Sequence, residues 1–259
     1  MDHEAEPGVR LRLHFDSAIA RDIYCHDHEV AERAFVRLFL KPDDVFVDIG
    51  ANLGLYSVLA SGIVGPSGAV FSFEPDPKAY ERLLFNLKAN DRTNVQTFQL
   101  ALSNADETRA MQISTKGFDA YNSFATPVCG EGTFQSRDVT CVSYDSFAGQ
   151  HPVMQKAVMV KVDVEGWETM VVHGAKRHLS GDAAPVVMLE FNDQAAKSSG
   201  QPCCELYRWL QALGYSIYTF DARNRRLVPH PYQEHYVYDN VFAIKNLDYV
   251  TQRIGEAHA

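Results

Sequence analysis

Apolar residues along this chain recur at two spacings. Short, nearly continuous apolar runs are typical of strands covered on both faces of a parallel sheet, whereas apolar residues three or four positions apart predict amphipathic helices. The two kinds of segment alternate through most of the sequence, which predicts right-handed βαβ units and one doubly wound α/β sheet. We expect strands at 45–49, 69–73, 95–102, 158–164 and 186–191, and helices at 28–39, 55–63, 78–89, 167–178 and 205–213.

Two regions interrupt this alternation. Residues 103–155 hold no convincing long helix, only extended pieces at 109–113 and 139–142 around a loop rich in Gly, Ser, Thr and Asn. A structureless loop of that length is uncommon in a compact domain unless it is functional. At the C-terminal end, strand-like segments without intervening helices predict an antiparallel hairpin that closes the sheet; they lie at 215–220, 226–228 and 237–244.

The expected fold is therefore Rossmann-like α/β, with a doubly wound, seven-stranded, mainly parallel sheet and an antiparallel C-terminal hairpin. Residues 1–40 are expected to form an N-terminal extension: a hairpin, with strands at 11–15 and 20–24, and then a helix. Residues 41–259 are expected to form a single domain with an insertion at about 104–155. The chain of 259 residues is long enough to bury a sizeable core.

Composition argues against several kinds of partner. The 33 acidic side chains outnumber the 24 basic ones, which gives a formal net charge of -9. Nucleic acids and anionic lipids are bound by clustered Lys and Arg, so we expect no nucleic-acid partner. No uncharged apolar run approaches the roughly 20 residues that cross a bilayer. The N-terminal residues lack the pattern of a signal peptide, and the five cysteines show no disulfide spacing. We expect a cytoplasmic protein without a membrane partner.

The stretch VFVDIGANLGLYS predicts a ligand-binding turn. Asp48 ends the first strand of the alternating region, Gly50 lies in the turn and Gly54 begins the helix. Ligands of open α/β sheets bind at the carboxyl ends of the strands, although the spacing is not the G-x-G-x-x-G of dinucleotide sites and also fits an ordinary strand-to-helix turn. Glu74 ends the next strand, where a carboxylate can accept both hydroxyls of a ribose.

Charged residues interrupt a later apolar strand in the stretch KVDVEGWE. Because side chains alternate along a strand, Lys161, Asp163 and Glu165 are expected to project to one side. Burying such charges is unfavourable unless they are paired or functional, and a purely structural Lys161–Asp163 ion pair is the alternative. Glu190 and Asn192 lie near the end of the following strand, so polar groups are expected to converge on one edge of the sheet.

These motifs resemble those of the FkbM family of S-adenosylmethionine-dependent methyltransferases, within the class I methyltransferase fold. The resemblance covers about residues 45–192, and its segments are DIGANLGLYS, FEPDP, LLFNLKAND, ALSNADE, KVDVEGWE and HGA. It implies S-adenosyl-L-methionine as the cofactor, with the ribose on Glu74, the adenine beside 101–103 and the sulfonium near the KVDVEG segment. The implied cofactor-binding residues are Asp48, Gly50, Ala51, Asn52, Gly54, Tyr56, Glu74, Pro75, Ala101, Leu102, Ser103 and Asp163. Trp167 departs from the family, which commonly has a small residue there.

The family most often O-methylates sugars or hydroxylated natural products, and the chemistry of the site agrees. Methyl transfer from a sulfonium is an in-line displacement that depends on positioning, and a carboxylate can take the proton of the attacking hydroxyl. The candidates for this base are Asp163, Glu165 and Glu190, which we leave unranked, with Lys161 tuning them or orienting the acceptor. The acceptor is expected to contact Glu190, Asn192 and a loop that contains Tyr121, Asn122 and Ser123.

The functional hypothesis is an O-methyltransferase that acts on a hydroxyl of a small molecule, a sugar or a polyketide or peptide natural product. A nicotinamide-dependent reductase is one alternative, although the chain lacks G-x-G-x-x-G and a Tyr followed four residues later by Lys. A non-catalytic methyltransferase-like binding protein is another. We expect no metal site, since the histidines and cysteines lack ligand spacing. The Tyr-rich segment 230–240 and the oligomeric state, a homo-oligomer included, stay open.

Overall fold

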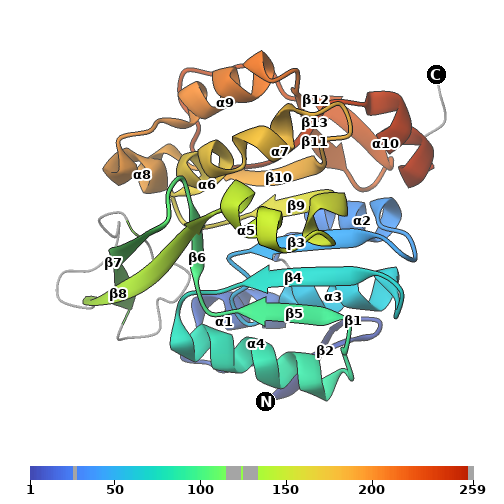
Figure 1. Ribbon diagram of the computed structural model, residues 1–259. Helices are drawn as coiled ribbons and strands as arrows, with labels where there is room; N and C mark the ends of the chain where they lie inside the picture. The colour runs from blue at the N-terminus through green and yellow to red at the C-terminus, as the bar shows by residue number, and fades with distance from the viewer. Residues whose placement is uncertain (26–27, 115–123, 125–133, 256–259) are drawn as a thin grey trace.

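The computed structural model describes residues 1–25, 28–114, 124 and 134–255 (Figure 1). Its central sheet has eight strands in the order β12-β11-β13-β10-β9-β3-β4-β5. Neighbouring strands from β5 to β10 are parallel, and those from β10 to β12 are antiparallel. The strands are β3 (Val45–Ile49), β4 (Ala69–Phe73), β5 (Val95–Phe98), β9 (Ala157–Val162), β10 (Val186–Phe191), β11 (Ser216–Asp221), β12 (Arg226–Pro229) and β13 (Asp239–Ile244).

The predicted α/β class and the antiparallel closure of a mainly parallel sheet are confirmed. The sheet has eight strands where seven were expected, because the short β12 pairs with β11 along all its residues. The predicted strand 158–164 ends earlier, at Val162. The predicted helix 167–178 is divided at Ala175 into two helices.

Helices cover both faces of the sheet and complete three layers. Buried side chains of one group of helices pack on one face around Phe35 and Leu59; these are α1 (Ala18–Tyr24), α2 (Val30–Phe39), α3 (Leu55–Val64), α4 (Pro77–Ala89) and α10 (Leu247–Ile254). A second group packs on the other face around Phe73 and Val171; these are α5 (Tyr144–Gln150), α6 (Glu168–Gly174), α7 (Lys176–Ser180), α8 (Asp193–Ala196) and α9 (Cys203–Ala212). Two single 3₁₀ turns lie at Met154–Lys156 and Lys197–Ser199.

The N-terminal hairpin was predicted at the wrong residues. It is formed by β1 (Asp2–Glu6) and β2 (Val9–Arg12), whereas the predicted strand 20–24 belongs to α1. The hydroxyl of Ser17 accepts the Ala20 N–H and caps this helix, and the apolar Ala20 and Ile23 face the core at helical spacing. Sequence alternation alone did not distinguish these two outcomes.

The predicted strand 95–102 is also two strands in two different sheets. Residues after β5 turn away from the central sheet, and β6 (Ala101–Ser103) joins a three-stranded sheet with β8 (Phe134–Ser143) and β7 (Glu107–Ser114). The extended pieces expected at 109–113 and 139–142 lie in β7 and β8, whereas α5 in the same region was not expected. This small sheet stands beyond the arrowheads of the parallel strands (Figure 1).

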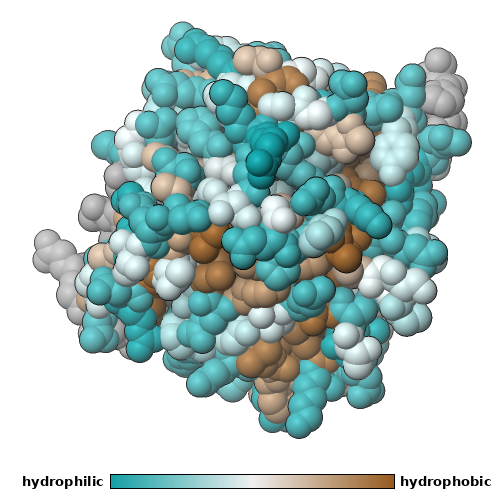
Figure 2. Space-filling model, viewed as in Figure 1, coloured by the Kyte–Doolittle hydropathy of each residue, from teal (hydrophilic) through white to brown (hydrophobic). Residues whose placement is uncertain are grey.

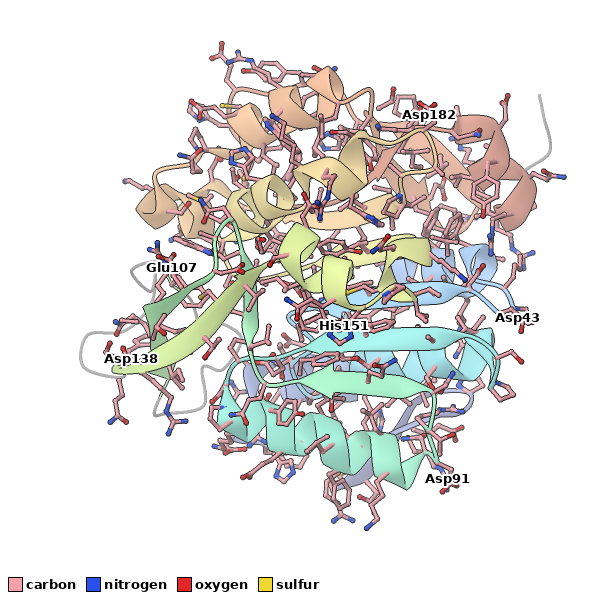
Figure 3. All side chains as sticks on the ribbon, viewed as in Figure 1. Asp43, Asp91, Glu107, Asp138, His151 and Asp182 are labelled. Carbon is pink, nitrogen blue, oxygen red and sulfur yellow. The ribbon has the colours of Figure 1, made fainter. Side chains whose placement is uncertain are left out.

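The described surface is largely hydrophilic on the face shown in Figure 2, where hydrophobic atoms form separate patches. On the same face, His151 stacks on Phe147 with ring centroids 4.1 Å apart and lies against Phe98 at the edge of the sheet (Figure 3). Among the helices of the described residues, none is both long and apolar enough to span a bilayer.

Candidate active site

The carboxyl ends of β3, β4, β9 and β10 meet at one edge of the sheet, beside β6. Gly50 follows β3 and Asp163 follows β9, and their backbones are nearly in contact. A Cβ atom on Gly50 would lie 1.9 Å from the Asp163 carbonyl oxygen, and Gly50 has a φ of 79°. Only glycine combines that φ with so close an approach, which explains the glycine of the DIGAN motif.

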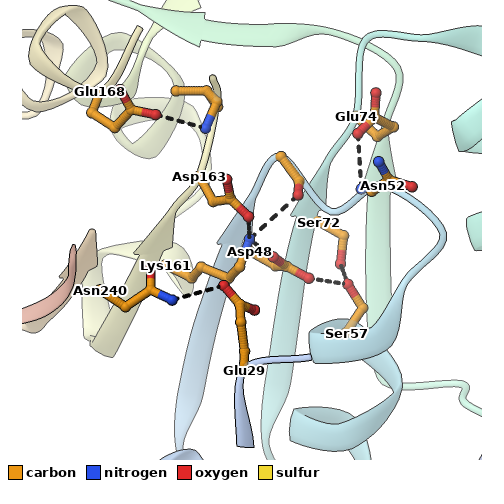
Figure 4. A network of polar contacts seen from close by, with 12 residues as sticks. Glu29, Asp48, Asn52, Ser57, Ser72, Glu74, Lys161, Asp163, Glu168 and Asn240 are labelled. Atoms are coloured by element: carbon orange, nitrogen blue, oxygen red, sulfur yellow. Dashed lines mark hydrogen bonds and ion pairs between the residues drawn. The ribbon is translucent and has the colours of Figure 1, made fainter. Parts of the chain in front are cut away.

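Glu74 follows β4 and is fixed by backbone donors. The Asn52 N–H donates to its carboxylate at 2.8 Å (Figure 4), and the Asp76 N–H donates to the other oxygen at 2.8 Å. Its exposed fraction is 6%, and burial raises the pKa of Glu74 to about 8 despite these two hydrogen bonds. A carboxylate has about four lone-pair sites, so the geometry leaves acceptor capacity for further hydroxyl donors.

A pocket extends from Glu74 to Asp163. Among the predicted cofactor residues, Gly50, Asn52, Glu74, Pro75, Ala101, Leu102 and Asp163 line it. The predicted catalytic residue Glu165 lines it as well. Residues that the sequence reasoning did not select complete the wall: Ile19 from α1, Ile49, Phe73, Leu100, Met111 from the insertion, Phe124, Val164 and Trp167.

Five of the predicted cofactor residues do not line this pocket: Asp48, Ala51, Gly54, Tyr56 and Ser103. Gly54 lets α3 pack on α4, since a Cβ there would lie 2.7 Å from Leu83. The Ser103 hydroxyl accepts the indole N–H of Trp167 at 3.1 Å. This bond ties Trp167 to β6.

Lys161 is at the centre of a buried polar network (Figure 4). Its Nζ lies 2.9 Å from the Asp163 carboxylate and 3.9 Å from that of Asp48. Burial would lower the pKa of Lys161, but the adjacent carboxylates, Asp163 first, raise it above its ordinary value. Asp48 accepts the Ser57 hydroxyl at 2.6 Å through one oxygen, and burial raises its pKa. Lys161 is thus a permanent cation that holds two carboxylates.

Glu165 does not follow the strand alternation that was expected. Because β9 ends at Val162, Glu165 lies in a turn with a φ of 53°, followed by Gly166 with a φ of 89°. Sequence reasoning missed the residue that shapes this turn: the buried Glu168 accepts the N–H groups of Val164 and Gly166 at 3.0 and 3.2 Å. Its position three residues after Glu165, at the start of a helix, was an available signal.

Burial keeps the carboxyl groups of Glu165, Glu168 and Glu190 protonated to unusually high pH. It raises the pKa of Glu168 to about 7 and that of Glu190 to about 8, and it raises the pKa of Glu165 well above its ordinary value. Nearby negative charges add to the effect at all three. Asn192 donates to Glu190 at 3.1 Å, so the predicted pair at the end of β10 is present.

The structure adds two residues from outside the predicted site. Glu29, at the start of α2, accepts the side-chain N–H of Asn240 at 3.2 Å, and Asn240 is the β13 partner of Glu190 in the sheet register. The sequence placed Glu29 in the N-terminal extension, and no local pattern there indicates contact with β13. The Tyr-rich segment therefore ends beside the polar network.

Three predicted acceptor residues, Tyr121, Asn122 and Ser123, lie outside the described residues. Phe124 is described, and its ring lies 5.4 Å from Trp167. Within the described part of the chain, no group of three His, Cys, Asp or Glu side chains is arranged to hold a metal ion.

The model of the family described as the methyltransferase FkbM domain matches residues 48–217. The hexuronic acid methyltransferase AglP of Haloferax volcanii is 28% identical over 152 residues, which cover 55% of this chain and 56% of that protein. The match thus spans little more than half of that relative. Methyltransferase 1 of Beauveria bassiana is 25% identical over 199 residues, covering 66% and 70% of the two chains. The crystal structure of methyltransferase FkbM from Methylobacillus flagellatus is similar at a TM-score of 0.48 and 14% identity, covering 91% of this chain and 56% of that one.

Proposed function

Because the chain belongs to the methyltransferase FkbM family, we propose that it transfers the methyl group of S-adenosylmethionine to a hydroxyl oxygen of a small molecule. The observation that carries the proposal is Glu74, a buried carboxylate at the end of β4 with free acceptor capacity toward the pocket. Membership of a methyltransferase family leaves the nicotinamide-dependent reductase without support.

The pocket residues fit this cofactor. Glu74 would accept the two ribose hydroxyls, and Ala101 and Leu102 would border the adenine. The Asn52 Oδ1 atom is buried without a hydrogen-bond partner among the described residues, which fits a site that a polar ligand completes. When bound, the cofactor supplies a methyl carbon activated by a positively charged sulfur, and the Asp163 carboxylate at the edge of the pocket favours a positive charge.

Glu190 is the best-suited general base among the three candidates. Asp163 is paired with Lys161, and burial raises the pKa of Glu165 well above its ordinary value. A pKa of about 8 lets Glu190 exchange a proton near neutral pH. The ionised form of Glu190 would accept the proton that the acceptor hydroxyl gives up on methylation, while the sulfur of the cofactor would leave with the electron pair of its bond to the methyl group. Lys161 would stay charged and keep Asp163 in place.

The acceptor class proposed is a sugar or a polyketide or peptide natural product. The Haloferax volcanii relative is named for a hexuronic acid, which supports a sugar and makes a uronic acid one specific candidate. A non-catalytic binding protein would keep the cofactor site and lack a methyl acceptor.

Calorimetry with S-adenosylhomocysteine tests the proposal. We expect the purified protein to bind it, and Glu74→Gln to weaken binding by about 10- to 100-fold, because the amide replaces one of the two oxygen atoms that would accept the ribose hydroxyls with a donor. Glu81→Gln is the matched control, since Glu81 is exposed on the adjacent helix α4, and its affinity should equal that of the wild type. Absence of binding to the wild-type protein would contradict the proposal. Transfer of a labelled methyl group to hydroxylated compounds then tests the reaction.

A further inference from the structure

The N-terminal extension reaches the cofactor pocket through α1. Ile19, in the first turn of this helix, lines the pocket together with Asn52, Glu74 and Pro75. Ile19 also packs against the core on the same side of the sheet, and Ile23, one turn later, is buried in that core. Helix α1 therefore has one face on the core and its first turn at the pocket, although it precedes every strand of the central sheet in the chain.

Asp16 attaches the start of α1 to α4. Its carboxylate lies 2.5 Å from the Lys78 ammonium group and 2.7 Å from the Arg82 guanidinium group. These cations lower the pKa of Asp16, and the hydrogen bond from Lys78 contributes most. Helix α1 has only seven residues, and so short a helix is marginal in water without tertiary contacts. The contacts of Asp16 therefore help to fix where the first turn of α1 lies.

Helix α4 is in turn connected to Glu74. The Asp76 N–H donates to the Glu74 carboxylate, and the Asp76 side chain caps α4 by accepting the Lys78 N–H. Lys78 thus contacts Asp76 through its backbone and Asp16 through its ammonium group. A continuous set of polar contacts leads from the carboxylate proposed to bind the ribose to the residue that precedes the cap of α1.

Two asparagines of the motif LLFNLKAND attach the rest of the extension to the same helix. Asn86 is fully buried; it accepts the Arg12 N–H at 2.7 Å and donates to the Leu53 carbonyl at 2.8 Å. Asn90 accepts the Arg10 N–H at 3.0 Å and donates to the Arg10 carbonyl at 2.5 Å. Leu53 belongs to the turn that follows β3, so the Asn86 side chain joins this turn to strand β2 of the extension.

We infer that Ile19 contacts the bound cofactor, and that Asp16 is the positioning residue that keeps Ile19 at the pocket. The inference rests on the proposed function and adds the N-terminal extension to its cofactor site. An apolar side chain at this wall removes ligand surface from water and excludes water from the pocket, which strengthens hydrogen bonds to Glu74.

The ion pair that positions Ile19 is open to salt. The side chains of Asp16 and Lys78 are 51% and 60% exposed, and dissolved ions screen exposed charges. The affinity for the cofactor should therefore depend on ionic strength through Asp16, a residue that does not line the pocket.

Calorimetry with S-adenosylhomocysteine on the full chain tests the contact of Ile19. We expect Ile19→Ala to raise the Kd by about 3- to 10-fold, because apolar contact area is lost. Ile63→Ala is the matched control: Ile63, on α3, is also partly buried against the same core but is not among the pocket residues. Its Kd should stay within about twofold of the wild type. Unchanged affinity in Ile19→Ala, or an equal loss in Ile63→Ala, would overturn the contact.

The salt dependence of the Kd tests the role of Asp16. At an ionic strength of about 0.01 M, Asp16→Asn should raise the Kd by about 3- to 10-fold, and at about 1 M the two proteins should bind equally, because salt screens the ion pairs of the wild type. Asp16→Glu, which keeps the charge, should recover part of the affinity. Asp2→Asn is the control, since Asp2 pairs with Arg12 inside the hairpin at 2.7 Å, and it should bind as the wild type does.

The outcomes separate this inference from the proposed function. Each Kd is measured well below the Tm of the variant, so that loss of folded protein is not counted as weaker binding. An effect of Asp16→Asn that is equally large at high salt, or is matched by Asp2→Asn, would overturn the positioning role of Asp16. Failure of the wild-type protein to bind S-adenosylhomocysteine at either salt concentration would contradict the proposed function, and the inference would fall with it.

Discussion

Lys161 and Asp163 form an ion pair 2.9 Å long at the end of β9, in which the lysine is 3% exposed. Asp48 is the β3 partner of Lys161 in the sheet register and lies on the other side of the ammonium group. One cation thus lies between Asp48, near the end of β3, and Asp163, the first residue after β9. Of this pair, Asp163 lines the pocket.

Replacing Lys161 by Met should leave two carboxylates without their cation. We expect Lys161→Met to lower the free energy of unfolding by about 3 kcal/mol, because removing one partner of a buried pair leaves an uncompensated charge. The double variant Lys161→Met/Asp48→Asn should recover part of this loss, since the amide needs no counter-charge. Urea denaturation of the wild type, Lys161→Met, Asp48→Asn and the double variant measures the coupling energy between the two side chains. Strictly additive changes in the free energy of unfolding would contradict this prediction.

Gly50→Ala should disturb the contact between the turns after β3 and β9. The added Cβ would lie 1.9 Å from the Asp163 carbonyl oxygen, so the turns must separate. Gly200→Ala is the control, because Gly200 has a similar φ of 73° and no atom within 4 Å of the added Cβ. We expect a loss of about 1–2 kcal/mol for Gly200→Ala and about 2 kcal/mol more for Gly50→Ala. Equal Tm shifts would show that crowding at Gly50 is unimportant.

The contribution of Glu190 to the stability of the ligand-free protein should fall as the pH rises. Glu190 ionises near pH 4.5 in the unfolded chain and near pH 8 in the folded one. Between these values the folded state binds more protons, so this contribution is complete below pH 4.5 and is lost as the pH rises through 8. Glu190→Gln should therefore be more stable than the wild type at pH 9, by roughly 1–3 kcal/mol, and equal to it near pH 4.5. Tm measurements across this range test the sign, and a gain confined to low pH would contradict it.

Cofactor binding should be visible in the fluorescence of Trp167. Of the two tryptophans in the chain, Trp167 lines the pocket, whereas Trp209 lies on α9 with its ring 4.9 Å from His173. S-adenosylhomocysteine should change the emission of the wild type and of Trp209→Phe. It should leave Trp167→Phe nearly unchanged. The opposite pattern would place the ligand away from the pocket.

The strands nearest the site were the most predictable elements. The runs at 45–49, 69–73 and 186–191 correspond residue for residue to β3, β4 and β10, because strands buried on both faces leave a continuous apolar signal. The segment 95–102 gave the same signal but divides between two sheets. A local pattern reports that residues are extended and buried, and it does not report which partner strand they join.

Some residues of the candidate site could also be predicted from the sequence, and others could not. Glu74, Lys161, Asp163 and Glu190 could be selected from the sequence, since each is a charged residue at or next to the end of an apolar run. The roles of Glu29 and Glu168 were harder to predict from the sequence. Glu168 accepts backbone N–H groups of a turn, and this turn forms because β9 ends at Val162. Glu29 lies 211 positions from its partner Asn240.

The sequence by itself determined the α/β class, the family and the edge of the sheet at which the polar residues gather, because strand and helix periods and strand-end motifs are local properties. Tertiary structure alone decided that Asp48 does not line the pocket, that Trp167 is tied to Ser103, and that Glu29 reaches the network from the N-terminal extension. Those relationships depend on which segments pack against one another. The sequence gives the net charge of -9 only as a sum over all side chains. The structure shows that two of the negative groups, Asp48 and Asp163, lie beside the buried Lys161.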